Sequence, residues 1–224
     1  MFREICNALM NKYLAQVSNS RIGAKCRLVQ PVKLEGRNLI SKGSTIINCS
    51  FGFASYVGDN VSLTNAKIGR YTSIGPCVSN IIGRHPTRTF ASLHPAFFSL
   101  AQQVGFTYAT SQLFEEYKYA DEKQNSIIIG NDVWIGAHSL ILEGVTIGDG
   151  AIVGAGSVVS KSIEPYTIYA GNPMNYIRKR FSDSDIEFLL TLRWWDNDAK
   201  WIQNYAPYFA NVSQLIEILR QELK

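Results

Sequence analysis

Apolar positions recur every six residues over much of the chain. From residue 129 the sequence reads IGNDVW, IGAHSL, ILEGVT, IGDGAI, VGAGSV and VSKSIE, so an aliphatic residue leads each group. A small or aliphatic residue lies four positions after each leader, and glycine directly follows four of the six leaders. A step of six matches neither the helical period of about 3.6 nor the alternation of one strand. It indicates short strands joined by tight turns.

The first half carries a looser version of the same repeat. Leaders follow at six-residue steps from Ile22 to Ile46, and two steps shorten to five between Ile46 and Ile74. Asn38 and Lys67 interrupt the series of small and aliphatic partners. One such unit cannot bury its apolar face alone, so the units are expected to stack into a solenoid. Three flat faces would give coils of about 18 residues, although the spacing fixes neither the number of faces nor the hand.

Two segments depart from the repeat. Residues 79–126 carry no six-residue pattern and are rich in Phe and Tyr, which predicts an ordered excursion loop. The repeat also ends after Pro173, and a polar SDSD run then precedes IEFLLTLRWW, as expected for a capped amphipathic helix. The expected parts are an N-terminal helical cap over residues 1–19, a β-helix domain over residues 20–178 that includes the loop, and a C-terminal helical segment over residues 179–224.

Composition excludes several classes of protein. The net charge is only +4 and the basic residues are scattered apart from Arg178–Arg180, which argues against nucleic acid as the main partner. None of the four cysteines forms a C-x-x-C pair, which argues against a zinc ribbon and favours a reducing, cytoplasmic location. The N-terminus lacks the apolar core of a signal peptide, and the longest uncharged stretch, residues 89–114, is too polar for a membrane span.

Histidine is the most informative candidate for chemistry. His85 and His94 each precede a proline in the excursion, and His138 lies at a turn-like position of the repeat. A positioned imidazole can take a proton from a hydroxyl near neutral pH. The chain has no G-x-S-x-G motif that would indicate a serine acyl-enzyme.

The combination of NIIGRHPTRTF, IIIGNDVWIGAHSLILEGVTIG and YAGNP resembles the hexapeptide-repeat acyltransferases. Within them it is similar to the xenobiotic and sugar O-acetyltransferase branch, which includes galactoside, maltose and surface-polysaccharide acetyltransferases. The likeness covers roughly residues 50–181. It implies an all-β solenoid, a left-handed parallel β-helix of triangular section with an extended loop insertion and terminal α-helices, assembled as a homotrimer. It also implies acetyl transfer from acetyl-coenzyme A (acetyl-CoA) to a hydroxyl, with no metal.

The resemblance assigns roles to particular residues. The family's G-x-H-P histidine corresponds to His85, the expected general base, with His94 as its rival. The backbone N–H of Ala137 would stabilise the tetrahedral oxyanion. In a trimer, His85 of one subunit would lie opposite coils 129–160 of another. The expected coenzyme contacts are Ala137, Ala155, Ser160, Lys161 and Arg178, with Trp134 lining the thioester channel and Asn175 replacing a frequent family arginine.

Several alternatives stay open at this stage. HPAFFSL and GFTYATSQLFEEYKYAD look most like acetyltransferases of surface-polysaccharide biosynthesis, which favours a sugar or glycan hydroxyl as acceptor over a xenobiotic hydroxyl. An amino group on a nucleotide-linked sugar is a further candidate. Gamma-class carbonic anhydrases share the β-helix and bind metal through three histidines, but the spacing of the histidines here does not resemble theirs. A non-catalytic β-helix scaffold is the remaining alternative.

Overall fold

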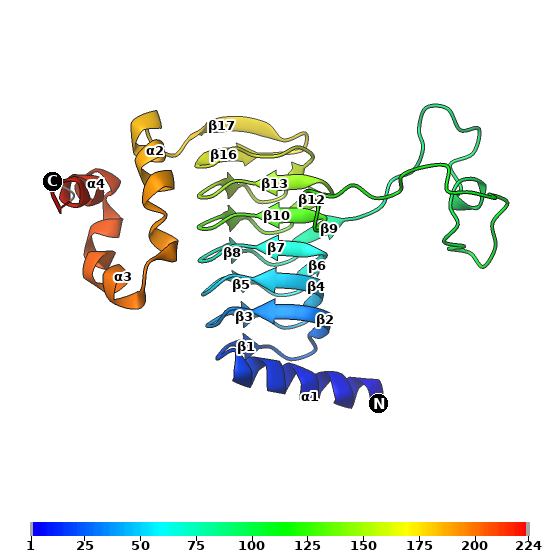
Figure 1. The fold of residues 1–224 in the computed structure, drawn as a ribbon, viewed down its shortest axis with the longest axis horizontal. Helices are drawn as coiled ribbons and strands as arrows, with labels where there is room; N and C mark the ends of the chain where they lie inside the picture. Colours follow the sequence, from blue (N-terminus) through cyan, green and yellow to red (C-terminus); the bar gives the residue numbers. More distant parts are fainter. Residues whose placement is uncertain (1, 223–224) are drawn as a thin grey trace.

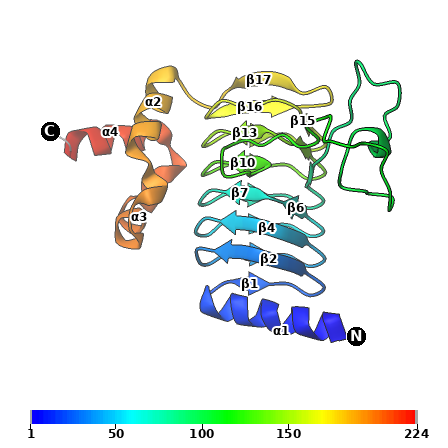
Figure 2. The ribbon, with the colours of Figure 1, turned by 45° about the vertical axis from the view of Figure 1, so that its right-hand side comes forward.

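The computed structural model describes residues 2–222, so Met1, Leu223 and Lys224 of the two predicted helical ends lie outside the described residues. A stack of coils is closed at one end by helix α1 (Phe2–Val17). Helices α2 (Asp183–Leu192), α3 (Ala199–Tyr205) and α4 (Val212–Glu222) lie along one side of the stack, and the excursion projects from the opposite side (Figures 1 and 2).

One face of the solenoid is a sheet of short parallel strands, one from each coil. Arg21 pairs with Leu39, and Trp134 pairs with Ile152, so one coil takes 18 residues. The pairs Leu39–Tyr56 and Tyr56–Ser73 are 17 residues apart because those coils contain the two five-residue steps. The parallel strands of this face are β1 (Arg21–Ile22), β3 (Leu39–Ile40), β5 (Tyr56–Val57), β8 (Ser73–Ile74), β11 (Trp134–Ile135), β14 (Ile152–Val153) and β16 (Thr167–Ala170).

The remaining strands form two further faces. This is visible in two long strands, each of which bends at a corner and continues from one face into the next. In β4 (Thr45–Phe51), Thr45 pairs with Ser62 of one strand while Ser50 pairs with Lys67 of another. Strand β2 (Arg27–Leu34) follows the same bend. The second face continues through β6 (Ser62–Thr64), β9 (Ser79–Ile81), β12 (Leu140–Leu142) and β15 (Val158–Val159), and the third through β7 (Ala66–Ile68), β10 (Ile127–Ile129) and β13 (Val145–Ile147). The predicted left-handed parallel β-helix with three faces is confirmed.

The repeat positions make up the core. The leaders from Ile40 to Val159 are buried, and the smaller partners fill the corners. Asn38, which breaks the pattern, is 1% exposed, and its Nδ2 donates to the carbonyls of Gly52 and Ser55 at 2.7 and 3.1 Å. A buried amide is tolerated when its hydrogen bonds are satisfied. Lys67 breaks the pattern because the step from Leu63 to Ile68 has five residues instead of six. The buried Ala66 therefore fills the corner, and Lys67 is exposed.

Two boundaries differ in detail from the sequence pattern. Residues 79–81, expected in the excursion, form strand β9 on the second face, and the loop leaves the coil after Ile81. Beyond the last coil, β17 (Asn175–Lys179) pairs antiparallel with β16, a strand that the repeat does not predict. The short helices η1 (Pro95–Phe97), η2 (Trp194–Asp196) and η3 (Ala206–Ala210) complete the described elements. Within residues 2–222 no helix is long and apolar enough to cross a membrane.

An ion cluster and an aromatic cluster hold the C-terminal helices against the coils. Arg70 pairs with Glu35 on the solenoid and, at 3.2 Å, with Asp196 of η2. The hydrogen bond from Arg70 lowers the pKa of Glu35 below its ordinary value. Beside it, the ring of Tyr71 lies 4.9 Å from that of Trp194. These contacts join segments that lie more than a hundred residues apart in the sequence.

Candidate active site

The structure fixes the tautomer of His85. Its Nδ1 lies 2.6 Å from the carbonyl oxygen of Leu93, and the side chain is exposed. A carbonyl oxygen only accepts hydrogen bonds, so Nδ1 carries the proton and donates. In the neutral ring the lone pair is therefore on Nε2. This is the arrangement that a general base requires, with one nitrogen oriented and the other ready to take a proton.

Aromatic side chains of the excursion support this ring. Phe98 is fully buried, and its ring meets His85 edge to face with centroids 5.9 Å apart. Phe90 and Phe114 pack on Phe98 at 6.0 and 5.7 Å. The excursion thus has a small core of its own, which holds the imidazole in place although the loop lacks regular strands.

Glu143 anchors the segment that carries His85, and the sequence analysis did not identify it. This carboxylate follows strand β12 and its side chain is 6% exposed. One oxygen accepts a hydrogen bond from the backbone N–H of Gly83 at 3.0 Å, and the other lies 3.3 Å from Nε of Arg84. Arg84 also donates to the Glu115 carbonyl at 2.9 Å and lies over the Phe114 ring. The buried carboxylate therefore fixes the start of the loop to the coil, and Arg84 links this point to residue 115.

The other two histidines have different surroundings. Nδ1 of His94 accepts a hydrogen bond from the backbone N–H of Ala96 at 3.2 Å and caps η1. Because Nδ1 accepts, a neutral His94 carries its proton on Nε2 and has no second lone pair to act as a base. His138 occupies a left-handed turn with φ 60° and is exposed. Within residues 2–222 no group of three His, Cys, Asp or Glu side chains could hold a metal ion.

Ala137 and Ala155 lie one above the other at one corner of the coils. The N–H of Gly156 donates to the carbonyl of Ala137 at 2.8 Å. A Cβ on Gly136 would lie 2.4 Å from the backbone nitrogen of Ala155, so only glycine permits this close stacking. The N–H groups of Ala137 and Ala155 have no acceptor among the described residues. The oxyanion role expected for the Ala137 N–H requires such an unpaired donor.

The remaining predicted coenzyme residues are exposed. Trp134 begins β11 and is 56% exposed. Ser160 and Lys161 follow β15, and Nζ of Lys161 lies 5.7 Å from the centre of the Tyr169 ring. Arg178, on β17, donates to the carbonyl of Lys179 at 2.9 Å. Exposed aromatic and cationic side chains of this kind can bind an extended anionic molecule along the coils.

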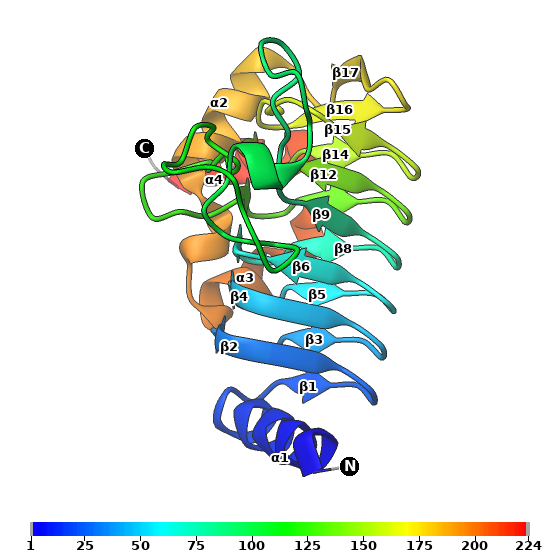
Figure 3. The same cartoon turned by 90° about the vertical axis from the view of Figure 1, so that its right-hand side faces the viewer.

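One chain does not bring these residues together with His85. The described contacts of His85 are with Leu93 and Phe98, both in the excursion. The loop leaves the solenoid at the corner that follows β9. Ser160 and Lys161 lie at the same corner two coils further along the stack, because β9 pairs with β12 and β12 pairs with β15. Ala137 and Ala155 occupy a different corner, at the other end of the face that contains Leu140–Leu142. The excursion points away from the stack (Figures 1 and 3).

A cavity of about 1070 Å³ lies at the far end of the molecule, between α1 and the first coil. None of the residues predicted for catalysis or coenzyme binding lines it. The candidate active site is thus an exposed set of groups on two edges of the solenoid.

Comparison with known proteins agrees with the fold. The family model "Bacterial transferase hexapeptide (six repeats)" matches residues 126–161. A protein named "Probable macrolide acetyltransferase" from Lysinibacillus sphaericus is 50% identical over 97 residues, 43% of this chain and 54% of that protein. A chloramphenicol acetyltransferase from Klebsiella aerogenes is 38% identical over 142 residues, 62% of this chain and 63% of that protein. The chain thus spans between half and two thirds of the length of these relatives.

A solved structure shows the same architecture at lower sequence identity. A mutant of AntD, an N-acyltransferase from Bacillus cereus, was crystallised in complex with dTDP and coenzyme A. It is 20% identical, with a TM-score of 0.51 over 81% of this chain and 96% of that one. This similarity concerns the fold alone. The six-residue repeat and the three-faced coils of this chain are thus similar to those of the bacterial hexapeptide transferases, and its curated relatives are named acetyltransferases.

Proposed function

We propose that this protein transfers the acetyl group of acetyl-CoA directly to a hydroxyl group. Nε2 of His85 takes the hydroxyl proton while the oxygen attacks the thioester carbonyl. The tetrahedral intermediate then collapses, the C–S bond breaks, and the coenzyme A thiolate takes up the proton from the imidazolium. The products are an acetyl ester and free thiol, and no acyl-enzyme forms.

The hydrogen bond between His85 and Leu93 carries this proposal. It leaves a free lone pair on Nε2 of His85, whereas the lone pair of His94, the rival histidine, is on Nδ1 and is used by the helix cap. His85 is therefore the base that the geometry favours. Its ring is held by Phe98 on one side and by the Glu143 anchor at its N-terminal side.

The coil residues supply the binding functions. The unpaired N–H of Ala137 can donate to the oxyanion, and Ala155 leaves room for an extended arm at the same corner. Lys161 and Arg178 provide positive charge for the phosphates of the coenzyme. Asn175 in place of the family's frequent arginine leaves fewer cations for this purpose.

The active site is proposed to form between two copies of the chain in a homotrimer. His85 and the Ala137 corner lie on different edges of one solenoid, and the loop points away from its own coils. A neighbouring copy would place its Ala137 corner opposite His85. Exposed apolar side chains of the excursion, including Leu100, Val104 and Leu113, would then be covered.

Two acceptor classes have specific support. The curated relatives are named for macrolide and chloramphenicol acetylation, which favours the hydroxyl of an antibiotic or similar xenobiotic. The exposed rings of Phe97, Tyr108 and Phe106, with neighbouring centroids 5.3 Å apart, favour a sugar hydroxyl because flat apolar sugar faces stack on aromatic rings. The second class corresponds to the glycan acceptor expected from the sequence.

Thiol release from acetyl-CoA, measured with a panel of antibiotic and sugar acceptors, tests the function. At least one hydroxyl acceptor should accelerate release, and mass spectrometry should find an acetyl ester. His85→Ala should lower turnover roughly 100- to 10,000-fold with nearly unchanged coenzyme affinity, because only the base is lost. His94→Ala is the matched control and should retain most activity. The reverse result for the two variants would show that the base is misassigned.

A further inference from the structure

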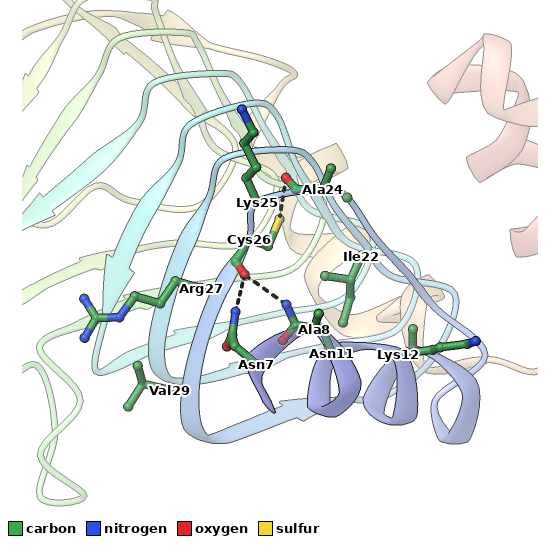
Figure 4. A pocket seen from close by; sticks show the side chains of 12 residues that line it. Asn7, Ala8, Asn11, Lys12, Ile22, Ala24, Lys25, Cys26, Arg27 and Val29 are labelled. Atoms are coloured by element: carbon green, nitrogen blue, oxygen red, sulfur yellow. Dashed lines mark hydrogen bonds between the residues drawn. The ribbon is translucent and has the colours of Figure 1, made fainter. Parts of the chain in front are cut away.

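Helix α1 packs Leu14 against the core of the solenoid, but it also turns two asparagines toward the coil and a set of large apolar side chains outward. Toward the coil, Nδ2 of Asn7 and of Asn11 both donate to the Cys26 carbonyl, at 2.7 and 2.9 Å (Figure 4). The outward face carries a stripe of large apolar side chains at helical spacing. A surface helix normally turns its apolar stripe to the core. The outward stripe consists of Leu9, Met10, Tyr13 and Val17, which are 64%, 48%, 64% and 61% exposed.

The same end of the molecule holds the positive charge of the chain. Residues 5–34 contain five basic residues and no Asp or Glu. Since the whole chain has a net charge of +4, all its other residues together carry −1. The five side chains are exposed, and none forms an ion pair with a side chain of residues 7–222. They are Lys12 on α1 and Arg21, Lys25, Arg27 and Lys33 on the first coil.

We propose that α1 and the first coil dock on the surface of an anionic phospholipid bilayer. The helix lies across the end of the solenoid, so its outward stripe can rest flat in the interface (Figures 1 and 3). Leu9, Tyr13 and Val17 enter the boundary between headgroups and acyl chains while the cations meet lipid phosphates. Such a helix binds on a membrane without spanning it. This inference is independent of the acetyl transfer proposed above.

A second copy of the chain fits this surface less well. Pairing α1 with its own copy would bring two cationic ends together, and like charges oppose such contact. Nucleic acid would match the charge but would leave the apolar stripe without a partner. A bilayer of anionic lipid is the one surface that satisfies both features.

The cavity beneath α1 offers a place for a headgroup. It is lined by Lys12, Lys25 and Arg27, whose side chains point away from the two asparagines (Figure 4). Asn11 is 8% exposed, and its Oδ1 has no donor among the described residues. A buried acceptor without a donor is unfavourable. The three cations point away from Asn11, so they would meet lipid phosphates around the cavity, while a lipid hydroxyl inside the cavity would supply the donor for Asn11.

Co-sedimentation of the full chain with vesicles tests this proposal. Vesicles of phosphatidylcholine with about 30% phosphatidylglycerol should bind the protein at least tenfold more strongly than pure phosphatidylcholine, and salt should weaken the binding. Lys25→Glu/Arg27→Glu and Leu9→Ser/Tyr13→Ser should each reduce binding about tenfold or more. The matched control Lys123→Glu/Lys200→Glu reverses two exposed charges elsewhere and should bind like the wild type.

Each other outcome contradicts the proposal. Equal binding to both vesicle types, or no binding, would exclude recognition of anionic lipid. A fall in molecular mass caused by Leu9→Ser/Tyr13→Ser, measured by light scattering, would assign the stripe to self-association instead. Because all four substituted residues are exposed, the variants should keep the wild-type melting temperature, and this is verified before the vesicle assay.

Discussion

At the scale of single residues, the candidate base depends on contacts that its own sequence motif does not reveal. The G-x-H-P pattern identified His85, but the direction of its lone pair follows from the Leu93 carbonyl. Glu143 could not be recognised in advance, because a carboxylate at a turn of a solenoid is usually solvated. It is buried because the backbone at Gly83, 60 positions earlier in the sequence, packs over it and donates a hydrogen bond to it.

Glu143 should influence the rate more than the affinity for the coenzyme. Glu143→Gln keeps an acceptor for the Gly83 N–H and loses the charge that faces Arg84, so turnover should fall only a few-fold. Glu143→Ala removes both contacts and frees the loop, and turnover should fall roughly ten- to a hundredfold with little change in the KM for acetyl-CoA. Steady-state kinetics of the two variants provide the measurement. Equal rates for both variants and the wild type would remove Glu143 from the account.

At the scale of elements, the coils were predictable and the excursion was not. Each coil repeats the same local pattern, so the period and the buried leaders followed from the sequence, whereas the three faces followed only from the family resemblance. The two shortened steps of the repeat lie in the coils that have 17-residue registers. The excursion has no period. Its core joins Phe98 to Phe114 and Arg84 to Glu115, and such distant pairs leave no regular signal in the sequence. The antiparallel strand β17 escaped prediction for the same reason.

The contact between the C-terminal helices and the solenoid should weaken in acid. The hydrogen bond from Arg70 lowers the pKa of Glu35 from 4.5, so its carboxylate favours the folded state above that pH. That contribution is lost as pH falls through the lowered pKa. Thermal unfolding followed from pH 7 to pH 3 should show a smaller acid-induced decrease in melting temperature for Glu35→Gln than for the wild type. Glu217→Gln, at an exposed position on α4, should follow the wild type, and identical profiles for all three proteins would refute the assignment.

At the scale of the whole molecule, the candidate catalytic residues, the C-terminal helices and the cationic surface lie on different parts of the solenoid. The excursion and the exposed coil corners lie away from the C-terminal helices, and α1 closes the cationic end. The sequence placed the candidate base and the coil residues in separate segments, but a single chain does not unite them. The proposed function therefore depends on assembly, because in that proposal the base and the coenzyme site come from different copies.

Subunit mixing tests this central claim most directly. His85→Ala removes the base, and Ala155→Trp blocks the exposed coil corner, so each homotrimer should be inactive. In a purified trimer that contains both variants, one of the three sites would combine an intact His85 with an intact coil, and about a third of wild-type thiol release should return. Mixed oligomers that remain as inactive as the two parents would contradict a site shared between copies.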